Sequence, residues 1–189
     1  MMYYIKLSAI LFLICAVAAG ILAYVNGITD PRIRKIQEEK ETATRAELIP
    51  EADFPEVKGT LDTTFVYQRA IDKKSGELKG YTFVASRSGY SSVIKTMVGV
   101  DTLFNVIAIR VIDQKETPGL GANCTAEKFT DQFKERDISR LVLDKDGGGE
   151  GAVVSIAGST ITTRAITSSI RITLEKLQAE IKAAQGGEQ

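Results

Sequence analysis

The pattern of apolar and polar positions separates an apolar first segment from a mixed remainder. Residues 7–25 (LSAILFLICAVAAGILAYV) contain no charged side chain. A helix needs about 20 apolar residues to cross a bilayer. Tyr3, Tyr4 and Tyr24 lie near the ends of the run, where aromatic rings favour the membrane interface. The pattern therefore predicts one transmembrane anchor within residues 1–28.

A cleaved signal peptide is the competing interpretation of this segment. Ala16-Val17-Ala18 has the small-x-small form of a cleavage site. The apolar run continues well past Ala18, which favours a retained anchor. Bulky Ile14 directly before Cys15 argues against a lipoprotein signal.

Charge around the apolar run bears on its orientation. Before the run lies Lys6, and after it lie Arg32, Arg34, Lys35 and Lys40. Taken literally, the positive-inside rule places the rest of the chain in the cytoplasm. The rule is weak for long translocated domains, so this count alone leaves the side open.

A charged stretch follows the anchor. Residues 33–48 (IRKIQEEKETATRAEL) predict a short helix that begins near Pro31 and is ended by Pro50 and Pro55. Its mixed charges indicate a solvated face. Residues 29–57 are therefore expected to form a charged helical linker.

Several later segments have the β-branched composition of strands and are separated by turn residues. The expected strands are residues 63–71, 80–86, 89–99 and 104–112, with shorter ones at 141–143 and 152–156 on either side of a turn at 144–151. A short helix is expected at residues 126–133. Short strands joined by tight turns predict a mainly antiparallel sheet.

The chain is expected to end in a helix from about Thr160. Apolar residues recur there at helical spacing and form one stripe. They are Ile166, Ile170, Leu174, Leu177 and Ile181. The fold class is therefore α+β: a single N-terminal transmembrane helix, the linker, and one domain (58–189) with a mainly antiparallel sheet and a C-terminal helix.

Composition excludes several kinds of chemistry. Lys+Arg and Asp+Glu total 24 each, so no basic excess exists to bind nucleic acid. The chain has no histidine, which removes imidazole catalysis and histidine-ligated metals. Cys15 and Cys124 cannot supply the four ligands of an iron–sulfur cluster or a closed zinc site. We expect no metal site, and any redox chemistry would use an organic cofactor.

The first candidate motif is Glu116-Thr117-Pro118-Gly119-Leu120-Gly121, directly after the strand expected at 104–112. Two glycines flanking a leucine make a turn in which backbone can approach a flat ligand closely. A plain strand-to-helix turn remains the alternative interpretation.

The second candidate motif is Ala157-Gly158-Ser159-Thr160-Ile161-Thr162-Thr163-Arg164, at the start of the last helix. A helix N-terminus offers unpaired N–H groups and a positive dipole end, which suit a phosphate. Arg164, one turn in, would add a charged donor if it faces the same way. An ordinary N-cap is the alternative, because Ser and Thr are preferred there.

Together and in this order, the two motifs resemble the FMN-binding subunit family shared by two ion pumps. One member is the G subunit of the Rnf ferredoxin:NAD+ oxidoreductase, and the other is the C subunit of the sodium-translocating NADH:quinone reductase. The ETPGLG loop is unchanged at Glu116 to Gly121, and the family's Gly-Ala-Thr motif reads Gly158-Ser159-Thr160. Gly89-Tyr90, the anchor and the last helix also match, so the resemblance spans the chain. Its length of 189 residues favours the Rnf-type member.

The resemblance implies one FMN joined covalently by a phosphoester to Thr160. It also implies a cofactor site formed by two groups of residues. They are Glu116, Thr117, Gly119, Leu120 and Gly121 of the loop, with Gly158, Ser159, Thr162 and Thr163 of the second motif. The chain departs from the family at Ser159, where alanine is usual, and at Val154, where the motif often begins with aspartate.

Helical geometry favours a single acceptor among the clustered hydroxyls. On a helix that starts near Thr160, Thr162 and Thr163 project about 200° and 300° away from it. They cannot all face one phosphate. Ser159 belongs to the entering chain, so its hydroxyl is expected to point differently.

The family role implied is an electron carrier within an ion-translocating oxidoreductase, with no catalytic residue or substrate site of its own. The partners implied are the other membrane and peripheral subunits and a flavin transferase that uses FAD, since a threonine hydroxyl without a base is a poor nucleophile. The location implied is the bacterial cytoplasmic membrane, single-pass, with the domain on the periplasmic or extracellular side.

Three other functions remain open at this point. The chain could be a C subunit of the sodium-translocating quinone reductase, a free-standing anchored flavin reductase, or an anchored binding module without redox function. A reductase would need its own pocket and acid–base residue. A flavin that survives denaturation would separate a covalent flavoprotein from a module in which both motifs are only turns and caps.

Overall fold

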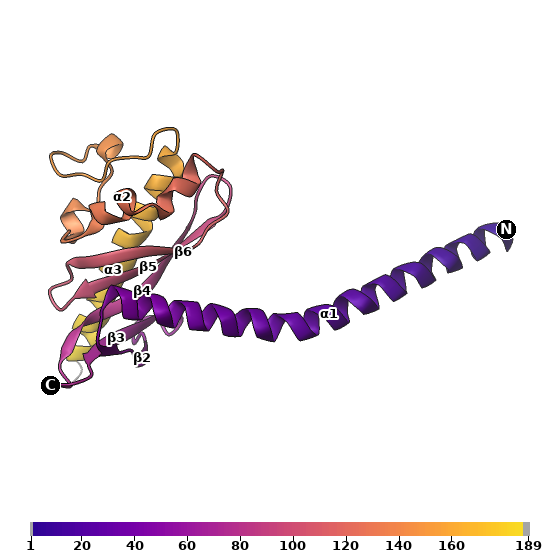
Figure 1. Ribbon diagram of the computed structural model, residues 1–189, viewed down its shortest axis with the longest axis horizontal. Coiled ribbons are helices and arrows are strands. Elements are labelled where there is room, and N and C mark those ends of the chain that lie inside the picture. Colours follow the sequence, from indigo (N-terminus) through magenta and orange to yellow (C-terminus); the bar gives the residue numbers. More distant parts are fainter. Residues whose placement is uncertain (1, 187–189) are drawn as a thin grey trace. The chain divides into compact units, whose positions relative to one another are not determined.

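The structure is a computed structural model that describes residues 2–186 (Figure 1). It divides into two compact units, one ending at Thr42 and the other beginning at Ala43. The limits expected from sequence for anchor, linker and domain stay predictions.

One continuous helix, α1 (Met2–Leu48), runs through both the apolar run and the charged stretch. The prediction of a separate helix that begins near Pro31 was wrong, because Pro31 lies inside α1. Proline there removes the hydrogen bond to the carbonyl of Gly27 at a cost of about 3 kcal/mol. Arg, Lys, Gln and Glu are strong helix formers and continue the helix beyond it.

The apolar part of α1 has the properties of a membrane span. Among the helices that the structure describes, α1 is the one long and apolar enough to cross a bilayer. Its large side chains are exposed, as with Phe12 at 76% and Leu22 at 70%. Apolar surface of this extent in a single helix is stable in hydrocarbon rather than in water.

Six described strands form one antiparallel sheet in the order β1-β3-β4-β5-β6, with β2 also paired to β3. The strands are β1 (Ala52–Asp53), β2 (Glu56–Lys58), β3 (Val66–Asp72), β4 (Leu78–Ser88), β5 (Val93–Asp101) and β6 (Val106–Asp113). The predicted antiparallel sheet is confirmed, and its four main strands overlap the predicted ones.

The two short strands predicted after β6 do not form. Residues 141–143 and 152–156 meet only in one parallel bridge, between Leu143 and Val153. Parallel pairing needs a crossover of about a dozen or more residues, and the intervening turn is too short for one. The predicted helix at 126–133 is present as α2 (Glu127–Thr130) and the 3-10 turn η2 (Asp131–Phe133). Single 3-10 turns are η1 (Gly121–Thr125), η3 (Ile138–Arg140) and η4 (Asp144–Asp146).

The final helix, α3 (Thr160–Gly186), packs lengthwise on one face of the sheet (Figure 1). Its predicted stripe is confirmed: four of its five residues are fully buried, and Ile181 packs against the same core. Alternate residues of the central strands, such as Phe83 and Val98, meet the stripe. The other face carries a smaller cluster in which Met97 packs with Leu48 and Ile49.

Glu180 joins the C-terminal half of α3 to the loop before β3. Its buried carboxylate accepts hydrogen bonds from the backbone N–H groups of Thr60 (2.6 Å), Leu61 (2.9 Å) and Asp62 (2.8 Å). These bonds hold the pKa of Glu180 below its ordinary value, although burial opposes them. The ionised form is therefore part of the folded structure.

Glu180→Gln is expected to lower the urea midpoint of unfolding, because an amide cannot accept all three bonds. A depressed folded pKa contributes stability above the unfolded value of about 4.3, and this is lost as pH falls through the folded pKa. The difference from wild type should therefore be full at about pH 6 and shrink toward about pH 3. Glu175→Gln, on the exposed side of the same helix, is the control. A pH-independent difference would contradict this role.

Candidate functional site

The two candidate motifs meet at the N-terminal end of α3. They line one cavity of about 460 Å³. Ligand pockets typically measure about 300–1,000 Å³. The lining residues are Tyr90, Glu116, Thr117, Leu120, Gly121, Lys145, Gly158, Ser159, Thr160, Ile161 and Thr162. Of the predicted site residues, Gly119 and Thr163 do not line the cavity.

Glu116 is the residue that fastens the site together. Its carboxylate accepts hydrogen bonds from the N–H groups of Tyr90 (3.2 Å), Ser91 (3.0 Å) and Ser92 (3.0 Å), which form the turn between β4 and β5. It also accepts bonds from the Ser92 hydroxyl (3.1 Å) and from Thr162 Oγ1 on α3 (2.6 Å). Burial raises the pKa of Glu116, but these hydrogen bonds outweigh it and hold the net pKa low. This one carboxylate therefore connects the loop that contains Glu116, the turn between β4 and β5, and α3.

Two glycines are required by the space around Glu116. A Cβ on Gly121 would lie 2.8 Å from Glu116 Oε2 and from Thr162 Oγ1. A Cβ on Gly89 would lie 2.8 Å from Glu116 Oε1. Gly119 has a φ of +78° and open space around it, so its conformation rather than its contacts requires glycine.

The hydroxyls of the second motif differ in exposure. Thr162 is 1% exposed and Thr163 is fully buried, where Thr163 Oγ1 donates to the carbonyl of Ser159 (2.9 Å) and accepts from the N–H of Ile156 (3.2 Å). Ser159 is also buried, at 6% exposed. Thr160 is half-buried and borders the cavity, so its hydroxyl is the accessible one on this first turn of α3.

Two cations lie near this first turn and have different partners. Lys145 Nζ donates to Thr160 Oγ1 at 3.1 Å. The sequence analysis considered Arg164 as a hydrogen-bond donor to a phosphate. It instead forms a bidentate ion pair with Asp146, with 2.7 Å between Arg164 Nε and Asp146 Oδ2. The cation at Thr160 is therefore Lys145.

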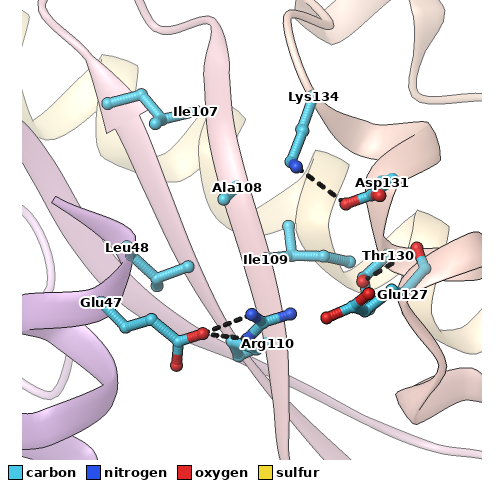
Figure 2. A pocket seen from close by; sticks show the side chains of 10 residues that line it. All are labelled: Glu47, Leu48, Ile107, Ala108, Ile109, Arg110, Glu127, Thr130, Asp131 and Lys134. Carbon is cyan, nitrogen blue, oxygen red and sulfur yellow. Dashed lines mark hydrogen bonds and ion pairs between the residues drawn. The ribbon is translucent and has the colours of Figure 1, made fainter.

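A second hollow, of about 380 Å³, lies along β6 and α2 and contains none of the predicted site residues (Figure 2). Its charged side chains largely neutralise one another. Arg110 pairs with Glu47, and Lys134 pairs with Asp131 at 2.8 Å. The first cavity is therefore the better candidate site.

The residues of the first cavity fit a flavin mononucleotide. At the head of α3 the cavity offers the Thr160 hydroxyl, the Lys145 ammonium and a buried Ser159 Oγ without a hydrogen-bond partner. These groups suit a phosphate, as does the positive end of the α3 dipole. Exposed apolar side chains, Leu120 and Ile161, border the same cavity and suit a flat aromatic ring.

The sheet, the helix and this cavity define an FMN-binding domain, and residues 89–175 match the FMN-binding domain family. The G subunit of the Na+-translocating ferredoxin:NAD+ oxidoreductase complex of Acetobacterium woodii is 33% identical over 92% of this chain and 91% of its own length. The chain belongs to the family of G subunits of ion-translocating oxidoreductase complexes. The resemblance seen in the sequence is confirmed.

Other proteins are similar over much of the chain. The G subunit of the ion-translocating oxidoreductase complex of Methanosarcina acetivorans is 29% identical over 93% of this chain and 95% of its own length. The crystal structure of Shewanella oneidensis NqrC is 22% identical, with a TM-score of 0.48 over 66% of this chain and 64% of that one.

Sequence reasoning missed Lys145 as a site residue. It lies in a glycine-rich turn far from both motifs, and a lysine beside acidic residues gives no pattern that points to Thr160. Tyr90 was noted only as part of a matching strand. It lies in the turn before β5, is 72% exposed and borders the cavity. The signal that the sequence contained was a tyrosine directly after a glycine.

Proposed function

We propose that this chain is the electron-transfer subunit of an Rnf-type ion-translocating oxidoreductase and carries one FMN bound covalently to Thr160. The observation that carries the proposal is the meeting of both motifs in one cavity, with the Thr160 hydroxyl accessible at its edge. Bound FMN supplies reversible electron transfer. The residues of the chain hold and orient it.

Attachment forms a phosphoester at Thr160. Its Oγ bonds to the FMN-side phosphorus of FAD, the pyrophosphate bond breaks, AMP leaves, and the hydroxyl proton passes to a base. The chain has no histidine, and the carboxylate of Glu116 is occupied by five hydrogen bonds. The base is therefore supplied by a separate flavin transferase.

The site residues divide by role in this proposal. Gly158 and Ser159 shape the phosphate end beside Thr160. Thr117 and Leu120 border the ring end. The remaining predicted residues position these groups: Glu116, Gly121 and Thr162 through the shared carboxylate, Thr163 through the junction before α3, and Gly119 through the turn.

The alternatives are less well supported. A free-standing reductase is less well supported, because the relatives that match over most of the chain are named as subunits of complexes. A non-redox module would not require an accessible hydroxyl beside a cation. The test is mass spectrometry of the full chain produced with a flavin transferase. The tryptic peptide Asp146–Arg164 should carry the mass of FMN, and unmodified peptide throughout would reject the proposal.

The other subunits of the complex are the proposed partners of the exposed apolar surface of α1. We propose that α1 spans the bacterial cytoplasmic membrane once and that the domain lies on the periplasmic or extracellular side. The literal charge count favours the opposite side.

Protease added to intact spheroplasts is expected to digest the domain and leave a fragment that contains the apolar run. Permeabilised spheroplasts provide the reference digestion, and a cytoplasmic protein monitors lysis. Complete protection in intact spheroplasts would place the domain in the cytoplasm. A mature N-terminus just after Ala18 would show that the anchor is not retained.

A further inference from the structure

Lys145 is placed by its neighbours rather than by its own contacts. On one side, the N–H of Asp144 donates to the carbonyl of Val153 (2.9 Å), and Asp144 Oδ1 accepts from the N–H of Ser155 (3.2 Å). On the other side, Asp146 pairs with Arg164 of α3. The turn is thus fastened before and after Lys145.

The side chain of Lys145 makes one polar contact, to the Thr160 hydroxyl at 3.1 Å. In the part of the chain that the structure describes, no carboxylate pairs with its ammonium. Lys176, which belongs to α3 itself, is by contrast paired with Asp62. The Lys145 ammonium therefore lies at the edge of the cavity, beside the proposed acceptor oxygen, without an ion-pair partner among the described residues.

A second observation at the same place also points to an anion. Ser159 lines the cavity, and its buried Oγ has no hydrogen-bond partner among the described residues. A buried hydroxyl without a partner costs about 1–3 kcal/mol unless something satisfies it. The N-terminus of the 27-residue helix α3 adds its partial positive charge. Two hydroxyls, an ammonium and the positive end of a helix dipole thus lie together at this end of the cavity.

We propose that Lys145 is the positioning residue for the phosphate at Thr160. This inference rests on the proposed function, and it identifies Lys145 as the source of positive charge beside the phosphate. Before attachment, its ammonium donates to a lone pair of Thr160 Oγ1 and leaves the hydroxyl hydrogen free to face the base of the transferase. The new bond joins Thr160 Oγ to phosphorus while the bond to AMP breaks, and Lys145 keeps its protons throughout. Afterwards its ammonium neutralises the single negative charge of the phosphodiester.

The first test measures the rate of FMN attachment to the full chain in detergent, with purified transferase and FAD. Flavin fluorescence of the denatured protein reports the bond. Lys145→Ala is expected to slow attachment about 10- to 100-fold, the range of a charge-assisted hydrogen bond. Lys145→Arg should restore most of the rate. Lys128→Ala, which removes an exposed lysine of α2, is the control and should react like wild type.

The second test uses phosphorus-31 NMR to detect the effect of Lys145 on the phosphodiester in the flavinylated protein. The phosphodiester keeps one negative charge at neutral pH, so its resonance reports the charge and the hydrogen bonds beside it. At neutral pH the resonance of Lys145→Ala is expected to differ in chemical shift from that of wild type, whereas that of Lys128→Ala should coincide with it. Lys145→Arg keeps the positive charge and should lie closer to wild type than Lys145→Ala does.

The outcomes separate this inference from the function on which it rests. If wild type carries no FMN, or carries it elsewhere than Thr160, the proposed function fails. If wild type is modified at Thr160 but Lys145→Ala reacts within about twofold of it, Lys145 does not position the phosphate. Failure of Lys145→Arg to restore the rate would exclude positive charge as the reason. A phosphorus resonance of Lys145→Ala that coincides with that of wild type would also overturn the proposal.

Discussion

Thr160→Ala is expected to abolish covalent FMN while leaving the fold intact. The other hydroxyls of the helix turn, Thr162 and Thr163, are buried and bonded within the protein, so neither can replace it. Thr160 is half-buried and contributes one side-chain contact to Lys145, so its loss should change the unfolding free energy by only about 0.5 kcal/mol. Flavin fluorescence after denaturing electrophoresis measures the bond, and circular dichroism measures the fold.

Thr160→Ser and Ser155→Ala provide the controls for this result. Serine keeps a hydroxyl at the same position and should restore attachment in part. Ser155 lies in the same tryptic peptide, so Ser155→Ala tests whether loss of any hydroxyl there is enough. Thr162→Ala should also keep the flavin, although it removes a bond to Glu116. FMN found on another residue in wild type would contradict the assignment.

Glu116→Ala is expected to have the largest effect on stability of any substitution at the site. It removes one acceptor from the N–H groups of Tyr90, Ser91 and Ser92 and from the hydroxyls of Ser92 and Thr162. A buried donor left without a partner costs about 1–3 kcal/mol, and water will satisfy some of these. The unfolding free energy should fall by about 3 kcal/mol or more. Urea unfolding followed by circular dichroism measures it.

The same substitution should also slow FMN attachment, although Thr160 remains in place. Without the carboxylate, the loop, the turn and α3 lose the hydrogen bonds that connect them, and the cavity loses its shape. Glu116→Gln keeps one acceptor oxygen and is expected to lose about half as much stability. Glu77→Ala, in the exposed turn between β3 and β4, is the control. Equal unfolding free energies of the Glu116→Ala and Glu77→Ala proteins would contradict the proposed stabilising role of Glu116.

The regular parts of the fold follow from periodicity. The apolar residues from Ile166 to Leu177 recur at helical spacing, which predicts a helix with one apolar face. The structure buries that face against the sheet. The strand segments were recognised because β-branched residues cluster between turn residues, although their ends differ from the observed ones by a few positions. Pro31 was misjudged because local propensity on both sides outweighs one lost hydrogen bond.

The internal connections of the site follow less directly from sequence. Nothing in the order of residues shows that Glu116 accepts from Ser91 and Thr162, because these contacts depend on how β4, β5 and α3 come together. The pairing of Arg164 with Asp146 has the same origin. It leaves Lys145 beside Thr160, an arrangement that the charge pattern of the turn does not predict.

The contact between Gly89, Gly121, Thr162 and one carboxylate has an evolutionary consequence. A Cβ at Gly121 would lie 2.8 Å from Glu116 Cβ and from Thr162 Oγ1 as well as from the carboxylate. A Cβ at Gly89 would lie 2.6 Å from Ile94 Cδ1 and 2.8 Å from Glu116 Oε1. Among related sequences that keep this glutamate, we therefore expect both glycines to be kept. Loss of the glutamate alone should free neither glycine, because Ile94 and Thr162 would still lie too close to a new Cβ.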